Sequence, residues 1–381
     1  MQIANDLNLL ALDNSAGVVF WKPAGLKLYE NLKSFIRNHH TVNGYLEVKT
    51  PSIVGESLFE QSGHLEKYKQ NMFILNAKEY NNYILRPMSC PNHIVVYQSE
   101  LQSYKNLPLS LFEFGEVFRN EPSGSLQVLF RQRQFCQDDS HIFVDKNNLS
   151  SSISNYLKMA ETVYKALGFD EVRYDISLRP DERFGSEHDW DLAEESLKSA
   201  CRLHGIEFNE LPGEGAFYGP KIELKVKDKL GRFWQLGTLQ LDYVLPNRFN
   251  LQFVNEYNEK ETPVIIHHAV LGSLERMIGI LLETFGTNLP EFLHPYPSVV
   301  IPVSAKSNEY AKLVANRIDA NVDSNDEPLG KKLATWRKKG VSKIYVVGEQ
   351  ESQYYNQHNI MQAMLNDKDG KHVVQLNYEN K

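Results

Sequence analysis

The sequence predicts an α+β protein in which a large antiparallel sheet flanked by helices precedes a small α/β domain. Strand-like runs joined by turns recur through the first part of the chain, which favours antiparallel pairing. Residues 289–297 then carry three prolines in nine positions. Because proline fixes φ and removes an amide donor, this segment predicts a stiff connector. Beyond it strand and helix alternate, so we expect domains at residues 1–289 and 298–381 joined by a linker at 290–297.

The elements of the first domain follow from the spacing of apolar side chains. Residues 26–37 carry them at helical intervals, and residues 45–51 alternate like a strand that ends at Pro51. Further strands are expected at residues 83–86, 111–117, 135–143, 221–226, 233–241 and 264–268. Further helices are expected at residues 92–101, 149–167, 189–204 and 271–284.

The second domain alternates more regularly. Strands are predicted at residues 299–301 and 343–347, and helices at residues 308–318 and 330–338. The second helix region is rich in lysine and arginine through residue 343. A solvated helix face is the ordinary interpretation of such a run, and a seat for a polyanion is the alternative.

Composition excludes several classes of protein. The 381 residues are 42% hydrophobic and 11% aromatic, enough for more than one core and too many for a disordered chain. No apolar run approaches the ~20 residues of a membrane span, and residues 1–17 lack the basic side chains of a signal or transit peptide. Three scattered cysteines favour a reducing compartment. We therefore expect a cytoplasmic protein, or a mitochondrial-matrix one in a eukaryote.

Net charge argues only weakly about partners. The value of −7 disfavours a general nucleic-acid binder, but it leaves room for a local basic patch that reads one nucleic acid.

The densest chemistry lies between residues 118 and 141. Two strands joined by a Gly/Ser/Pro loop would bring together the side chains of Arg119, Glu121, Arg131, Arg133 and Phe135. Guanidinium forks match phosphate, a carboxylate accepts from an exocyclic amine, and a phenyl ring stacks on a base. The set predicts a site for a purine nucleoside triphosphate without a P-loop, since the chain lacks the P-loop motif. The alternative is an arginine–glutamate ladder that braces a sheet.

These residues resemble the motifs of class II aminoacyl-tRNA synthetases. Arg119-Asn120-Glu121 with Arg131 and Phe135 resembles motif 2, residues 272–276 resemble motif 3, and the helix and strand ending at Pro51 resemble the looser motif 1. Within the class, the threonyl-tRNA synthetases are the most similar, through residues 86–91, 119–126, 137–143, 213–221 and 271–276. The resemblance extends from residue 17 nearly to the C-terminus and includes the anticodon-binding domain.

The resemblance implies a threonine–tRNA ligase that uses ATP, with Mg²⁺ on the phosphates, to form threonyl-adenylate and then charges tRNA(Thr). It places Arg119 on the α-phosphate, Arg131 on the γ-phosphate and Glu121 on the adenine amine, with Phe135 and Arg276 stacking on the ring. Further ATP-binding residues would be Gln235, Thr238 and Ser273. Threonine-binding residues would be Met88, Gln137, Asp139, Tyr218 and Gln240. Catalytic residues would be Arg119, Arg276, His64 and Lys221.

Three further residues form the second group. Taken alone, Cys90, His141 and His267 look like a buried cysteine and two ordinary histidines. The resemblance implies instead that they hold one zinc ion, with a position left open for the amino and hydroxyl groups of threonine. A metal that requires a hydroxyl rejects valine but not serine. Where the family usually has arginine, this chain has His268 beside His267, and strand alternation allows only one of the two to ligate.

Other expectations rest on the resemblance alone. His64 matches a histidine proposed to help deprotonate the ribose hydroxyl of the terminal adenosine, and Glu327 and Lys332 match positions that contact anticodon bases. Motif 1 implies a homodimer. Tyr218 and Lys221 also fit an ordinary hairpin connection. No segment matches the N-terminal editing domain of longer relatives, so we expect a short form without it, either a naturally short enzyme or an excised fragment of a longer one.

Two alternative functions remain. One is a related class II synthetase for proline or serine, against which the cysteine–histidine group argues. The other is a catalytically silent, synthetase-like RNA-binding or regulatory protein, against which the retained Arg119, Arg131 and Arg276 argue.

Overall fold

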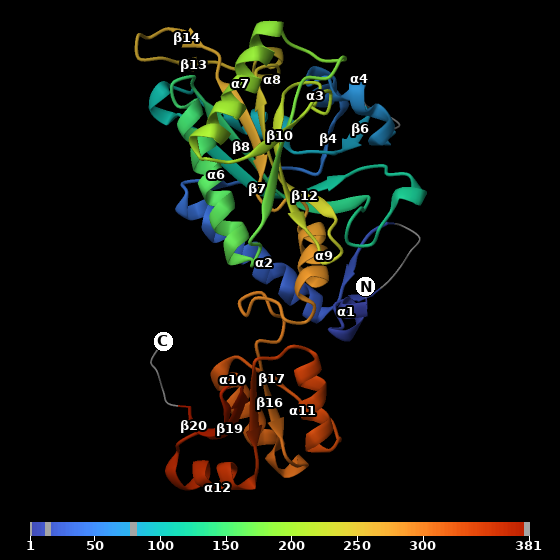
Figure 1. Cartoon of the computed structure of the whole chain (residues 1–381), viewed down its shortest axis with the longest axis vertical. Helices are drawn as coiled ribbons and strands as arrows, with labels where there is room; N and C mark the ends of the chain where they lie inside the picture. Colours follow the sequence, from blue (N-terminus) through green and yellow to red (C-terminus); the bar gives the residue numbers. More distant parts are fainter. Residues whose placement is uncertain (1, 12–16, 77–81, 377–381) are drawn as a thin grey trace. The chain divides into compact units, whose positions relative to one another are not determined.

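The computed structural model describes residues 2–11, 17–76 and 82–376 (Figure 1). The described chain forms two compact units. The larger consists mainly of Leu32–Ile280, and the smaller contains the residues from Leu281 onward with residues 2–11 and Trp21–Asn31. Among the described residues, no helix combines the length and apolar character needed to cross a membrane.

An eight-stranded sheet forms the centre of the larger unit. Its order is β10 (Phe208–Leu211), β9 (Val172–Ser177), β11 (Lys221–Lys227), β12 (Phe233–Asp242), β15 (Val264–Ala269), β8 (Gln134–Val144), β7 (Leu109–Phe118) and β3 (Leu46–Glu47). The six strands from β9 to β7 are antiparallel, as predicted, but the outer pairs β10–β9 and β3–β7 are parallel. The sheet is therefore mixed, because a helical crossover through α7 (Glu187–Leu203) brings β10 back parallel to β9.

Helices flank this sheet. They are α2 (Pro23–Val42), α5 (Cys90–Gln98), α6 (Leu149–Ala166), α7, α8 (Leu245–Arg248) and α9 (Leu274–Phe285). Helix α6 packs over β8 and β12 and against α7 (Figure 1). Helix α7 begins with a capping box between Ser186 and Asp189, which satisfies two amide donors at its N-terminus. Because helices and loops cover both faces of the central strands, all six residues of β15 are buried, its two histidines included.

The strand predicted at residues 45–51 forms only as β3. Thr50 does not continue the ladder, because its amide donates to the Glu113 side chain at 3.0 Å. The strand predicted at 83–86 belongs to a separate three-stranded sheet rather than the main one. This sheet has the order β4 (Ile53–Gly55), β6 (Tyr83–Leu85) and β5 (Phe73–Leu75), and α3 (Glu56–Gln61) and α4 (His64–Tyr68) lie between β4 and β5 in the chain.

Short elements complete the larger unit and the N-terminal segments. They are α1 (Gln2–Asp6), β1 (Leu10–Ala11), β2 (Phe20–Trp21), β13 (Phe253–Val254) and β14 (Lys260–Glu261).

The smaller unit contains a five-stranded sheet that is partly parallel, as predicted. Its order is β17 (Asn321–Val322), β16 (Ser298–Pro302), β18 (Lys343–Val347), β19 (Gln362–Asp367) and β20 (Gly370–Gln375), with helices α10 (Asn308–Ile318), α11 (Leu329–Lys338) and α12 (Glu349–His358). The first three strands are parallel and the last two antiparallel. Alternate residues of β16 pack into two cores, Val300 with α10 and Val299 with Trp336 of α11.

Candidate active site

A cavity of about 480 Å³ lies on one face of the central strands of the larger unit. Strand β8 supplies Phe135, Gln137, Asp139 and His141, which share a face because side chains alternate along a strand. Strands β12 and β15 and the turn before α9 supply much of the remaining wall. That turn contains Gly272 at φ +72°, where a β-carbon would lie 2.4 Å from a backbone oxygen of β12.

Most of the predicted site residues meet in this cavity. Those that line it are Met88, Cys90, Arg119, Phe135, Gln137, Asp139, His141, Tyr218, Lys221, Gln235, Thr238, Gln240, His267, Ser273 and Arg276. Among the described residues, the wall does not include His64, Glu121, Arg131, Glu327 or Lys332. Sequence reasoning did not assign Tyr68, which ends α4 and also lines the cavity, because nothing in the local sequence distinguishes it from a helix surface tyrosine.

The arginines at one part of the cavity are held by backbone oxygens. Arg119 donates to the oxygen of Pro87 at 3.2 Å, and its guanidinium carbon lies 5.1 Å from the centre of the Phe135 ring. Arg276 donates to the oxygen of Phe130 at 3.0 Å. Burial, followed by the charges of Arg119 and Arg131, lowers the pKa of Arg276. Several cations thus crowd together, which favours an anion such as a phosphate chain between them.

Glu121 and Arg131 contact one another instead of the cavity wall. Their Oε2 and Nη2 atoms are 2.8 Å apart, and Arg131 Nε lies 3.0 Å from the same oxygen. Arg133 supports the pair by donating to the backbone oxygen of Glu121 at 3.0 Å. The hairpin therefore brings these residues together as predicted, with the two proposed ATP contacts satisfying each other.

Cys90, His141 and His267 form a buried group. Their sulfur and ring nitrogen atoms all lie within 4.8 Å of one another. The first residue of α5 supplies the cysteine, and the register of β8 and β15 sets the two histidines directly opposite each other. These residues are far apart in the sequence, so the sheet register and the position of α5 together unite them.

The surroundings of this group suit a cation. His267 Nε2 lies 2.8 Å from Asp242 Oδ2, and His141 Nδ1 lies 2.8 Å from His93 Nδ1, which leaves one further nitrogen on each ligand ring. Burial, followed by the negative charges of Asp139 and Asp242, raises the pKa of the Cys90 thiol. A divalent cation would offset both effects, because it stabilises a thiolate and neutralises the carboxylates. The donor set of one sulfur and two imidazoles fits zinc.

His268 does not join the group. Its Nε2 atom lies 2.8 Å from the Tyr45 hydroxyl, and its ring stacks beside that of His40 at 6.1 Å. These contacts leave Nδ1 of His268 without a hydrogen-bond partner among the described residues, and His268 also lines the cavity. His267 beside it belongs to the group with Cys90.

His64 is buried beneath the cavity wall. Its Nδ1 lies 2.7 Å from the Ser62 hydroxyl, its ring edge packs on Phe217 and Tyr218, and its Nε2 has no hydrogen-bond partner among the described residues. Burial, with smaller contributions from neighbouring cationic groups, lowers the pKa of His64 to about 3. The imidazole is therefore neutral near pH 7 and a weak base, and its Nε2 can accept a hydrogen bond.

Lys221 is fixed by an ion pair. Its ammonium lies 2.7 Å from Glu223, which also contacts Lys225 at 2.9 Å. Gln240 donates to the backbone oxygen of Gly219 at 2.8 Å, so the turn that precedes Lys221 is tied to β12.

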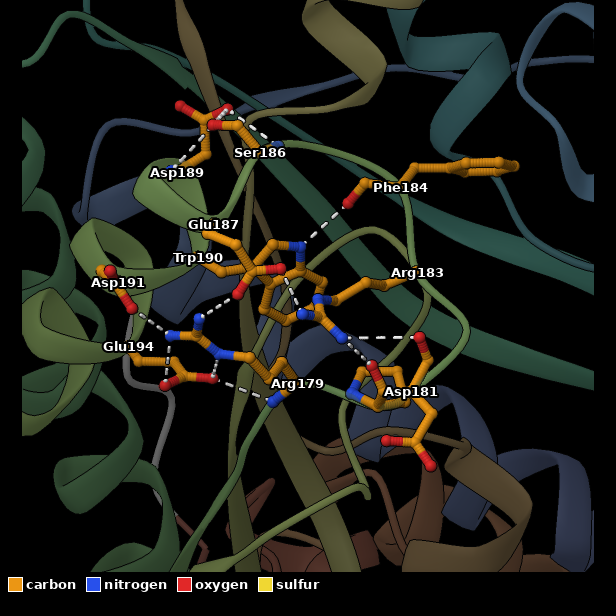
Figure 2. Close-up of polar contacts among 11 residues, drawn as sticks. Arg179, Asp181, Arg183, Phe184, Ser186, Glu187, Asp189, Trp190, Asp191 and Glu194 are labelled. Carbon is orange, nitrogen blue, oxygen red and sulfur yellow. Dashed lines mark hydrogen bonds and ion pairs between the residues drawn. The ribbon is translucent and has the colours of Figure 1, made fainter.

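A polar cluster shown in Figure 2 supports the loop next to this turn. Arg179 contacts three carboxylates of α7, those of Glu187, Asp191 and Glu194, at 2.6–3.0 Å. Trp190 donates to the backbone oxygen of Phe184, and the Phe184 amide donates to the oxygen of Phe217 at 2.7 Å. This loop thereby braces the segment that carries Tyr218.

The two predicted anticodon residues lie in the smaller unit. Glu327 forms an ion pair with Lys331 at 2.7 Å. Lys332 is 4% exposed and donates to the backbone oxygen of Asp323, so its ammonium does not face solvent.

Much of the basic run on and after α11 is also paired. Lys338 and Lys343 form ion pairs with Asp6 and Glu291, and Arg337 donates to Asn366. The run therefore offers less free positive charge than its composition suggests.

Two family matches cover most of the chain. The family described as "tRNA synthetase class II core domain (G, H, P, S and T)" matches residues 72–285, and the family described as "Anticodon binding domain" matches residues 298–371.

Curated relatives are threonine–tRNA ligases. That of Legionella pneumophila (strain Corby) is 43% identical over 344 residues, which are 89% of this chain and 54% of the relative. That of Burkholderia mallei (strain SAVP1) is 42% identical over 356 residues, which are 92% of this chain and 56% of the relative. The chain thus spans about half the length of the curated relatives it matches.

Solved structures show the same arrangement. The RNA binding domain of threonyl-tRNA synthetase from Cryptosporidium parvum Iowa II superposes with a TM-score of 0.92 at 37% identity, covering 98% of this chain and 95% of that one. Putative threonyl-tRNA synthetase ThrRS-1 from Aeropyrum pernix gives 0.81 at 28% identity, covering 99% and 91%. Prolyl-tRNA synthetase from Giardia lamblia gives 0.71 at 18% identity, covering 98% and 74%, which shows a shared fold.

Proposed function

The chain belongs to the threonyl-tRNA synthetase family of class II aminoacyl-tRNA synthetases, and we propose that it is a threonine–tRNA ligase. One observation carries the proposal: a single cavity is lined both by two arginines suited to bind phosphate, Arg119 and Arg276, and by the group Cys90, His141 and His267. Its volume of about 480 Å³ is in the range of small-molecule sites.

In the first step, a carboxylate oxygen of threonine attacks the α-phosphorus of ATP. The new bond gives threonyl-adenylate, while the bond to the β-phosphate breaks and pyrophosphate leaves. Mg²⁺ on the phosphates would offset their negative charge. Arg119 stabilises the charge that develops on the α-phosphate, and Arg131 binds the γ-phosphate. Glu121 accepts from the adenine amine, and Arg276 and Phe135 stack on its two faces. Glu121 and Arg131 also contact each other at 2.8 Å, so the two proposed nucleotide contacts lie side by side.

In the second step, the terminal ribose hydroxyl of tRNA(Thr) attacks the carbonyl carbon of the adenylate and AMP leaves. We assign to His64 the role of accepting a hydrogen bond from that hydroxyl through Nε2, because its pKa of about 3 makes it too weak a base to hold the proton. Lys221, held by Glu223, would offer a cation to the acyl oxygen and the phosphate of the adenylate.

Selection of threonine is assigned to the cysteine–histidine group. Zinc held by Cys90, His141 and His267 would supply an open coordination position for the amino and hydroxyl groups of threonine. Asp139, which is buried and lies in the same wall, accepts from the hydroxyl. Valine is rejected because it lacks that hydroxyl, whereas serine is not.

The remaining parts of the proposal concern assembly. Residues 298–381 would bind the anticodon region and residues 1–289 would carry the chemistry. Motif 1 would form the interface of a homodimer, and the enzyme would work in the cytoplasm.

ATP–pyrophosphate exchange with threonine, serine, valine and proline in parallel tests the activity. We expect the fastest exchange with threonine, slower exchange with serine and very little with valine. Exchange driven best by proline would reject the proposal in favour of a prolyl enzyme. Absence of exchange with all four amino acids would favour the silent RNA-binding alternative.

Removal of the thiol tests the metal group. Cys90→Ala should abolish threonine-dependent exchange and lower the bound zinc from one per chain to near zero. Cys201→Ala is the matched control, because Cys201 is equally buried but lies in α7, outside the group. Full activity of a zinc-free Cys90→Ala protein would contradict the assigned role.

A further inference from the structure

A buried polar chain extends from His141 away from the cavity. His141 Nδ1 lies 2.8 Å from His93 Nδ1, His93 Nε2 lies 3.3 Å from Glu113 Oε1, and Glu113 Oε1 lies 2.7 Å from Arg86 Nη1. All four residues are no more than 2% exposed. Only His141 of the four belongs to the cavity wall, so the other three serve some purpose other than direct contact with a substrate.

The contact between the two imidazoles fixes where protons lie. One Nδ1 must donate and the other accept at 2.8 Å. If His141 uses Nε2 as a metal ligand, its proton is on Nδ1, and His93 Nδ1 must accept it. The proton of neutral His93 then lies on Nε2. That atom has no hydrogen-bond partner among the described residues, and Glu113 Oε1, 3.3 Å away, is the acceptor that lies next to it.

The carboxylate at the end of the chain is held in place. Thr50 donates to Glu113 twice, from its amide at 3.0 Å and from its hydroxyl at 2.8 Å. Arg86 adds a charged contact, and it is itself anchored through Nε to the backbone oxygen of Glu116 at 2.8 Å. A buried carboxylate with this many donors is a rigid acceptor for His93.

We propose that His93 and Glu113 are positioning residues that fix the ring orientation and tautomer of His141 so that its Nε2 is presented to the metal. The inference rests on the proposed zinc site. The two histidine ligands then differ in their support. His267 contacts the carboxylate of Asp242 directly, whereas His93 lies between His141 and the carboxylate of Glu113.

Zinc affinity of the full chain, measured by competition with a chromogenic chelator, tests the inference without reference to catalysis. His93→Leu should weaken zinc binding about 10–100-fold, the usual effect of losing an outer partner of a ligand. His93→Gln should recover part of the loss, because its amide oxygen can accept from His141 Nδ1. His40→Gln is the control, since His40 is also fully buried and bonded to a hydroxyl, that of Ser140, but touches no ligand.

The outcomes separate the two proposals. A wild-type chain that binds no zinc rejects the metal site itself, and the inference falls with it. Wild-type zinc binding together with unchanged affinity of a folded His93→Leu variant rejects the inference alone.

A measurement on the unaltered protein guards against a variant that does not fold. In the zinc-loaded chain, long-range ¹H–¹⁵N correlations of labelled histidine should show His141 protonated on Nδ1 and His93 protonated on Nε2. Protonation of His93 on Nδ1 would overturn the inference.

Discussion

Removing one hydroxyl, in Tyr164→Phe, should destabilise the larger unit and disturb the proposed ATP site together. Tyr164 lies on α6 and is 1% exposed. Its hydroxyl donates to the backbone oxygen of Val270 at 2.8 Å and accepts from the backbone amide of Gly237 at 2.8 Å. Gly237 lies on β12 between Gln235 and Thr238, and Val270 leads into the turn before α9. One phenol therefore ties two walls of the cavity to α6.

The magnitude follows from the groups left behind. Phenylalanine keeps the ring and its packing, so the loss is confined to two hydrogen bonds. A net contribution of about 1 kcal/mol per bond gives a lower bound near 2 kcal/mol. The amide of Gly237 and the oxygen of Val270 would also remain buried without a partner, and each such group costs about 1–3 kcal/mol. We expect a loss of about 2–6 kcal/mol in the free energy of unfolding.

Urea unfolding of the full chain, followed by tryptophan fluorescence, measures this loss. Tyr97→Phe is the matched control, because Tyr97 is also 1% exposed but makes one longer bond, to the oxygen of Gln252 at 3.2 Å. The control should lose about 1 kcal/mol. The KM for ATP should rise in Tyr164→Phe and stay unchanged in Tyr97→Phe. Equal destabilisation of the two variants, or an unchanged KM in both, would refute the reasoning.

Three further predictions use other parts of the site. Gly219→Ala should cost about 3 kcal/mol or more and abolish exchange, because a β-carbon there would lie 1.7 Å from a backbone oxygen of β12. Gly124→Ala is the control, because a β-carbon there has no neighbouring atom within 4 Å, and it should change stability by less than about 0.5 kcal/mol. A comparable loss of stability in the two variants would contradict this explanation. Burial alone would raise the pKa of Glu194, but hydrogen bonds from its arginine partner lower it below 4.5. Stability from Glu194 is thus present above pH 4.5 and lost as pH falls through the lowered pKa, so Glu194→Gln should flatten the acid side of the stability profile measured by urea unfolding. Arg131→Ala should raise the KM for ATP about 10-fold, because it removes one charged contact worth about 1.4 kcal/mol. It should change stability by less than about 1 kcal/mol, because the Arg131 side chain in the pair with Glu121 is 51% exposed. Exchange kinetics and thermal denaturation of the same preparation test this prediction. A large loss of thermal stability would show that the effect is structural.

Most of the central strands were predictable from the sequence, but strand β9 was not. Strand β8 was expected at residues 135–143 and spans Gln134–Val144, although each of its faces mixes apolar and polar side chains. Strand β9 was not expected, because Asp175 at its centre looks like a solvent residue. In the structure Asp175 is fully buried and contacts Arg173 and Lys225 at 2.8–2.9 Å. Local pattern alone does not reveal such compensation, because the lysine lies 50 residues away on β11.

The site divides in the same way. The residues of the family motifs could be assigned to one site from the sequence, and most of them line the cavity. The burial of Lys332 could not be predicted from the sequence, since its ammonium donates to the backbone oxygen of Asp323 in the loop before α11. His93 carried no signal beyond its place near Cys90, and its importance follows only from the way α5 packs against β8.

The pair His267–His268 shows how one strand serves two environments. His267 faces a cysteine, a histidine and a carboxylate, a polar group that a cation would complete. His268 also lines the cavity, and its ring contacts Tyr45, His40 and Tyr156, none of which carries a carboxylate. Burial, with the charges of His40 and His267, lowers the pKa of His268 well below its usual range, so this ring is neutral. An arginine at position 268 would place a fixed charge among these neighbours without a carboxylate to offset it, and the uncharged histidine suits this chain because His40 stacks beside it.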